Sequence, residues 1–223
     1  MSVAANIKTI RDKLATFERS PALIAVSKTK PLAMLQEAYD NGQRLFGENY
    51  IQELTEKVPK MPKDVQWHVI GHVQTNKVTS ITRLVNEGYN ITVETIDSQK
   101  LAEQLNKRCN SKVNVMVEVH TSQEESKSGA SPEDVLPLVD FIKTLPQLNF
   151  VGLMTIGDPQ NPEACFKLMA ELKQNILEKY PNTACSLSMG MSSDYEVAIK
   201  YQTDYVRIGT AIFGAREYKT VEQ

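Results

Sequence analysis

Short apolar runs alternate with amphipathic segments along most of this chain. We interpret as buried strands the runs at residues 23–26, 44–46, 67–70, 91–93, 113–119, 149–156, 186–189 and 205–208. Apolar runs without strict alternation are typical of strands that are covered on both faces of a parallel sheet. The pattern therefore predicts a mainly parallel sheet whose strands are connected by helices.

Helical periodicity and capping signals occupy the segments between these runs. Apolar residues at helical spacing between positions 7 and 17 predict an additional helix before the first strand. Pro31 and Gly42 bracket the next helix, in keeping with the preference for proline at the start and glycine after the end. Residues 131–142 and 161–176 each begin with a cap residue and a proline, followed by one apolar face.

Eight predicted strands in 223 residues fit a compact (β/α)8 barrel, or TIM barrel, near the lower size limit of that fold. A doubly wound open sheet is the alternative. No glycine-rich G-x-G-x-x-G turn follows the first predicted strand, however, and the chain has S-K-T-K-P at 27–31 instead. We therefore predict an α/β protein that forms a single (β/α)8 domain over residues 1–223, with an extra N-terminal helix.

Composition and charge exclude several classes of protein. A hydrophobic content of 41% and a charged content of 23% are typical of a soluble globular protein. Lys and Arg total 25 against 27 Asp and Glu, and this balance argues against a nucleic-acid-binding protein. No apolar stretch approaches the ~20 residues that a membrane span requires, and the N-terminal segment lacks the apolar core of a secretory signal. We expect neither nucleic acid nor a membrane as a partner.

Cysteine and histidine are sparse in this chain. Cys109, Cys165 and Cys185 show no paired spacing, which predicts neither a disulfide framework nor a cysteine-rich zinc site. With only three histidines, a poly-histidine metal site is also not expected. A reducing compartment fits this cysteine usage best, so we predict a cytoplasmic protein without a metal centre.

A lysine stands at the C-terminal end of the first predicted strand, where barrel proteins place their functional groups. Lys28 follows an apolar run and a serine, and Lys30 is close by in the sequence. Desolvation and a neighbouring like charge both favour the neutral amine, which is a nucleophile toward aldehydes and ketones. On position alone, however, a lysine at the end of a strand is more often simply a solvated side chain.

Two glycine-containing turns follow the last two predicted strands, at residues 188–192 and 207–210. Phosphate sites of barrels are commonly built from the loops after strands seven and eight. Backbone N–H groups and hydroxyls in these turns can hold a phosphate without a metal, although each turn taken singly is as readily an ordinary cap. A nucleophilic Lys28 and a phosphate cradle at one barrel mouth together indicate pyridoxal 5'-phosphate, bound as a Schiff base.

Arg207 is the third candidate group. A guanidinium only donates hydrogen bonds and stays charged, so opposite the pyridine nitrogen of the cofactor it would keep that nitrogen unprotonated and the ring a weak electron sink. Alternatively, Arg207 pairs with a carboxylate at the barrel rim. A Schiff-base aldolase that uses Lys28 without a cofactor is a further alternative, but it leaves the two turns and Arg207 without a common purpose.

Motifs spread over almost the whole chain carry a family resemblance. They are A-V-S-K-T-K-P at 25–31, F-G-E-N-Y-I-Q-E at 46–53, W-H-V-I-G-H at 67–72, G-L-M-T-I at 152–156, S-M-G-M-S at 188–192 and V-R-I-G-T at 206–210. With these motifs, in this order, the chain closely resembles the pyridoxal phosphate homeostasis protein family. The departures are mild: Val73 and Thr75 stand where Leu and Ser are common, and the loop after Gly157 is short.

The resemblance implies a barrel like the N-terminal domain of alanine racemase, which binds pyridoxal 5'-phosphate through the first lysine of the S-K-T-K motif. In this chain that residue is Lys28, and Arg207 is the implied partner of the pyridine nitrogen. The implied phosphate contacts are Ser192, Gly209 and Thr210, with neighbouring contacts from Asn49, Met189 and Gly190.

The resemblance also implies a non-catalytic carrier that buffers and delivers the cofactor in intracellular vitamin B6 homeostasis. Apo forms of pyridoxal phosphate enzymes are candidate recipients. The alternative is an amino-acid racemase, which needs acid/base groups on both faces of the substrate. In alanine racemase a tyrosine from a second domain supplies one of them, and since this chain ends at Gln223 we expect no such domain. We expect a monomer, and leave the roles of Lys30 and Lys77 open.

Overall fold

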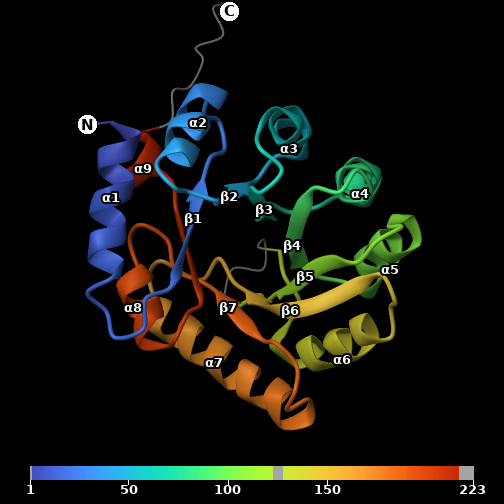
Figure 1. The fold of residues 1–223 in the computed structure, drawn as a ribbon. Helices are drawn as coiled ribbons and strands as arrows, with labels where there is room; N and C mark the ends of the chain where they lie inside the picture. Colours follow the sequence, from blue (N-terminus) through green and yellow to red (C-terminus); the bar gives the residue numbers. More distant parts are fainter. Residues whose placement is uncertain (1, 123–127, 216–223) are drawn as a thin grey trace, which may run out of the picture.

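The computed structural model describes residues 2–122 and 128–215. Its eight parallel strands form a closed barrel in chain order, and the last strand pairs with the first (Figure 1). They are β1 (Ala22–Val26), β2 (Leu45–Glu48), β3 (Gln66–Val69), β4 (Asn90–Ile96), β5 (Val113–Glu118), β6 (Leu148–Met154), β7 (Ser186–Ser188) and β8 (Tyr205–Ile208). The predicted (β/α)8 architecture is confirmed.

Helices surround the barrel and connect successive strands (Figure 1). The α-helices are α1 (Val3–Leu14), α2 (Leu32–Asp40), α3 (Ile51–Lys57), α4 (Val78–Asn86), α5 (Gln99–Arg108), α6 (Pro132–Lys143), α7 (Pro162–Lys179), α8 (Tyr195–Lys200) and α9 (Thr210–Phe213), and η1 (Val58–Lys60) and η2 (Thr75–Lys77) are short 3₁₀ turns. The extra N-terminal helix is confirmed: α1 buries Val3, Ile7 and Leu14 and packs against α2 and α9. In residues 2–122 and 128–215, no helix has the length and apolar character needed to cross a bilayer.

The predicted strand boundaries lie within two residues of the observed ones, except at β4, which runs three residues beyond its predicted end. Helices α6 and α7 begin at the predicted prolines, although the Ser131 hydroxyl donates to Asp134 Oδ2 at 2.7 Å instead of capping a backbone N–H. The predicted strand at 149–156 is too long at its end, because β6 ends at Met154. The Thr155 hydroxyl then contacts the carbonyl oxygen of Val119 at 2.9 Å, and the chain turns at Gly157 with a φ of 78°.

The interior of the barrel contains a buried polar layer. Glu94 on β4 accepts a hydrogen bond from the Ser188 hydroxyl on β7 over 2.6 Å. Since β5 and β6 separate these two strands in the sheet, the contact crosses the interior of the barrel. Both side chains have no measurable exposure. Buried polar groups require such partners, so this layer restricts how the strands around it can pack.

Candidate functional site

A cavity of about 330 Å³ opens among residues at, or just after, the C-terminal ends of several strands. This volume lies in the range of about 300–1,000 Å³ that is typical of small-molecule sites. The closed barrel brings six predicted site residues into its wall, namely Lys28, Asn49, Ser192, Arg207, Gly209 and Thr210. Side chains that are far apart in the sequence therefore face one ligand-sized space.

Two predicted site residues are not among those that line the cavity. The side chain of Met189 is fully buried in the hydrophobic core, and its N–H donates to the carbonyl oxygen of Tyr205 at 3.2 Å. Gly190 adopts a φ of 95°, and a Cβ at this position would lie 2.7 Å from the Cβ of Ala198. Both residues shape the turn that leads to Ser192, which explains their place in the motif.

Five further residues of the cavity wall were not predicted from the sequence. They are Val26, Ile70, Ile156, Met191 and Ser193. The apolar members stand at the ends of predicted strands or in the loop directly after one, so their position was a usable signal. They supply an apolar surface beside the polar turns, as an aromatic ligand requires.

Lys28 and Lys30 take different directions from the turn after β1. Lys28 is partly buried and lines the cavity. The Lys30 ammonium donates to the carbonyl oxygen of Ala215 at 2.6 Å, and Lys30 is not among the lining residues. Lys77 lines a neighbouring hollow of about 400 Å³, which shares Asn49 with the first cavity. Of the three lysines, only Lys28 lies in the wall of the cavity.

A chain of buried hydrogen bonds holds Arg207. Its Nη1 donates to the Ser188 hydroxyl at 2.9 Å, and its Nη2 donates to the carbonyl oxygen of Thr155 at 2.7 Å. Ser188 donates in turn to Glu94, whose other carboxylate oxygen lies 2.6 Å from Nδ1 of His68. The Arg207 side chain is therefore linked through Ser188 to Glu94 and His68 on the other side of the barrel.

The charged groups in this hydrogen-bond network compensate one another. Burial acts to raise the pKa of Glu94, but the hydrogen bond and charge of His68 and the charge of Arg207 outweigh it, so that this pKa lies below its usual value. Burial lowers the pKa of Arg207, opposed by the nearby carboxylates of Glu94, Glu118 and Asp194. Arg207 thus lines the cavity as a cation whose guanidinium is held by Ser188 and by the carbonyl oxygen of Thr155.

The two turns after β7 and β8 offer backbone donors. Within the described part of the chain, the N–H groups of Ser192, Gly209 and Thr210 donate to no protein acceptor. Asp194 stabilises the first turn by accepting from the N–H of Met191 at 2.7 Å. A Cβ at Gly209 would lie 3.2 Å from the carbonyl oxygen of Val26, so a side chain would crowd this wall. N–H groups of this kind are available as donors to an anion in the cavity.

Asn49 adds a further open hydrogen-bonding position. Its Oδ1 is buried and has no partner among the described residues, while the residue lines the cavity. A buried acceptor without a partner costs free energy unless a ligand or water satisfies it. An amine nucleophile, a fixed guanidinium, apolar walls and an anion cradle together fit an aromatic aldehyde that carries a phosphate.

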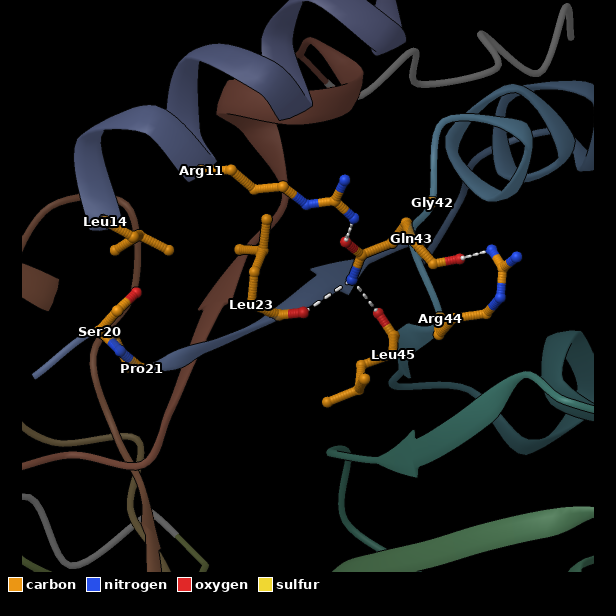
Figure 2. Close-up of a pocket in the computed structure, with 9 residues that line it drawn as sticks. All are labelled: Arg11, Leu14, Ser20, Pro21, Leu23, Gly42, Gln43, Arg44 and Leu45. Atoms are coloured by element: carbon orange, nitrogen blue, oxygen red, sulfur yellow. Dashed lines mark hydrogen bonds between the residues drawn. The ribbon is translucent and has the colours of Figure 1, made fainter.

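A further hollow, of about 270 Å³, lies at the opposite end of the barrel, at the N-terminal ends of β1 and β2 (Figure 2). Arg11 of α1 donates to Gln43 Oε1 at 2.8 Å, and Gln43 Nε2 donates to the carbonyl oxygens of Leu23 and Leu45 at 2.7 and 2.6 Å. These bonds fasten α1 to the ends of the two strands (Figure 2). None of the predicted site residues lines this hollow.

Comparisons with known sequences place the chain among relatives of similar length. The sequence model of the family described as "Alanine racemase, N-terminal domain" matches residues 1–217. The chain is 43% identical over 216 residues to the pyridoxal phosphate homeostasis protein of Homo sapiens, and the match covers 89% of this chain and 78% of the human protein. It is 40% identical over 238 aligned positions to the protein of the same name from Haemophilus influenzae, covering 99% and 98% of the two chains.

Comparison with solved structures finds proteins with a similar fold. A structure of PipY from Synechococcus elongatus PCC7942 with pyridoxal phosphate bound superposes with a TM-score of 0.82 at 29% identity, covering 96% of this chain and all of PipY. An alanine racemase from Clostridium difficile 630 superposes with a TM-score of 0.78 at 14% identity, and the match covers 59% of that enzyme. At this identity, the racemase likeness concerns the fold alone.

Proposed function

Because the chain belongs to the family of pyridoxal phosphate homeostasis proteins, we propose that it binds pyridoxal 5'-phosphate and acts as a carrier and buffer of this cofactor. The family predicted from the sequence motifs is confirmed. The observation that carries the proposal is the convergence of Lys28, Arg207 and the turns at Ser192 and Gly209 on one cavity. The domain unit we propose for this role is the whole chain, residues 1–223.

We assign each of these groups in the cavity wall to a part of the cofactor. Lys28 is the amine that forms a Schiff base with the aldehyde carbon. The N–H groups of Ser192, Gly209 and Thr210 hold the phosphate, with the hydroxyls of Ser192 and Thr210 as further donors. Arg207, which lines the same cavity, is the proposed donor to the pyridine nitrogen. When bound, the cofactor supplies a reactive aldehyde, and the protein holds that aldehyde in exchangeable form.

A carrier role without substantial catalysis is supported by the residues of the cavity wall. Lys28 and Arg207 are the only ionisable side chains among the described residues that line it. A racemase needs a second acid/base group opposite the lysine, and a guanidinium holds its proton too tightly for that purpose. Arg207 would also leave the pyridine nitrogen unprotonated, which weakens the ring as an electron sink. Apo forms of pyridoxal phosphate enzymes are the proposed recipients of the cofactor. We propose that the protein acts in the cytoplasm, as a monomer.

Absorbance spectroscopy of the purified protein tests the proposal. Addition of pyridoxal 5'-phosphate should produce a visible band that borohydride abolishes, and peptide mass mapping should place the reduced adduct on Lys28. A cofactor-free aldolase would show no such band as purified, before the cofactor is added. An adduct that maps to another lysine would overturn the assignment of Lys28, and the absence of any adduct would overturn the proposed function.

A further inference from the structure

Both peptide groups that flank Lys28 are held by one set of side chains from β2 and α3. On the N-terminal side, the carbonyl oxygen of Ser27 accepts a hydrogen bond from Lys57 Nζ over 2.8 Å. On the C-terminal side, the N–H of Thr29 donates to both carboxylate oxygens of Glu53, at 2.8 and 3.1 Å. The Lys28 side chain therefore leaves the backbone between two anchored peptide groups.

The anchoring side chains also bind one another. Lys57 Nζ lies 2.8 Å from Glu48 Oε1 and 2.6 Å from Glu53 Oε2. The Ser27 hydroxyl donates to the same Glu48 oxygen at 2.6 Å. Glu48 and Lys57 are 1% and 8% exposed, and buried charges are stable only with their partners in place. We call the three residues Glu48, Glu53 and Lys57 the Lys57 clamp.

The backbone conformation of Thr29 explains why the clamp stabilises this turn. Its φ is 61°, in the left-handed region that β-branched residues rarely adopt. The Glu53 carboxylate compensates for this conformation by accepting the Thr29 N–H with both oxygens. Without these bonds the turn would relax toward a negative φ, and Lys28 would leave the backbone in a different direction.

We infer that the Lys57 clamp positions Lys28 for its reaction with an aldehyde in the cavity. In that reaction the amine nitrogen of Lys28 forms a double bond to the aldehyde carbon, and its two hydrogens leave with the aldehyde oxygen as water. Glu53 and Lys57 do not line the cavity that contains Lys28, so they are positioning residues. The inference rests on the proposed function, and it assigns a role to the end of the F-G-E-N-Y-I-Q-E motif.

The clamp is best tested at Glu53, which is partly exposed and whose replacement removes least of the buried charge. Glu53→Met removes the acceptor for Thr29, and Glu56→Met, at an exposed position of the same helix, is the matched control. Two quantities are measured in each protein: amide hydrogen exchange of Thr29 without ligand, and the apparent Kd for pyridoxal 5'-phosphate. We expect Glu53→Met to accelerate the exchange and to raise the Kd about tenfold, as the loss of a charged hydrogen bond does, with no change in Glu56→Met.

A second variant separates positioning from general stability. Glycine adopts a positive φ without strain, so adding Thr29→Gly to Glu53→Met should recover much of the lost affinity. Unchanged Thr29 exchange in Glu53→Met would overturn the clamp, and faster exchange with unchanged affinity would overturn its positioning role. If the unsubstituted protein forms no adduct, both the proposed function and the positioning role are wrong. The exchange of the Thr29 amide still shows in that case whether Glu53 holds the turn.

Discussion

Arg207 Nη1 donates a hydrogen bond to the hydroxyl of Ser188 over 2.9 Å, inside the barrel and away from solvent. That hydroxyl in turn donates to Glu94, so a single serine connects the cation in the cavity wall to a buried carboxylate. The direction in which Arg207 points therefore depends on a side chain that does not itself line the cavity.

Removal of this bridge should destabilise the protein. Ser188→Ala leaves Glu94 Oε2 and Arg207 Nη1 without their shared partner, which costs about 1–3 kcal/mol of unfolding free energy. Urea denaturation monitored by circular dichroism measures the change. Ser131→Ala is the control: Ser131 makes no side-chain cap to the backbone, so we expect a change within about 0.5 kcal/mol. Equal losses in both variants would contradict the bridging role.

Lys28 and Lys30 should behave differently although they are two residues apart. Lys28→Ala should abolish the visible band with pyridoxal 5'-phosphate while the far-ultraviolet spectrum stays unchanged. Lys30→Ala should keep the band, because the Lys30 ammonium contacts the carbonyl oxygen of Ala215 instead of the cavity. A full band in Lys28→Ala would contradict the covalent assignment.

The phosphate cradle predicts a difference between two ligands. Thr210→Val keeps the shape of the side chain and removes its hydroxyl, which we assign to the phosphate. The Kd for pyridoxal 5'-phosphate should rise by about tenfold or more, in line with a hydrogen bond to a charged group. The Kd for pyridoxal, which lacks the phosphate, should stay the same. Parallel absorbance titrations measure both values, and an equal rise for the two ligands would place Thr210 elsewhere.

Racemase activity should be absent. Incubation of the loaded protein with L-alanine should yield no D-alanine above background, because the described cavity wall holds no second acid/base group opposite Lys28. Chiral chromatography measures the product. Efficient turnover would restore the racemase alternative.

The buried thiols predict a loss of stability at alkaline pH. Burial raises the pKa of Cys109 and that of Cys185 from 9.0 to about 11. The unfolded chain loses these thiol protons at lower pH than the folded protein does, so their contribution is complete below about pH 9 and is lost as the pH rises toward 11. The Tm should fall over this range. The fall should be smaller in the double variant Cys109→Ala, Cys185→Ala, and an identical fall would contradict the assignment.

The barrel was accessible to prediction because its signals are local. Each buried strand and each amphipathic helix leaves its own periodicity in a short stretch of sequence, and capping residues such as Pro132 and Pro162 mark where helices begin. In a parallel barrel all strand ends meet at one mouth, so Lys28 and the turn at Gly209 could be assigned to one site. This assignment follows from the topology of the barrel and does not depend on the distance between the two residues.

Partners that are distant in the chain were decided only by the tertiary structure. Ser188 and Glu94 are 94 residues apart, and Lys57 reaches the carbonyl oxygen of Ser27 across 30 residues. Whether Met189 faces the ligand or the core likewise depends on the path of its turn. Periodicity states which residues are buried, but the closure of the barrel and the register of its strands determine which buried groups meet, since each contact needs two segments to be placed together.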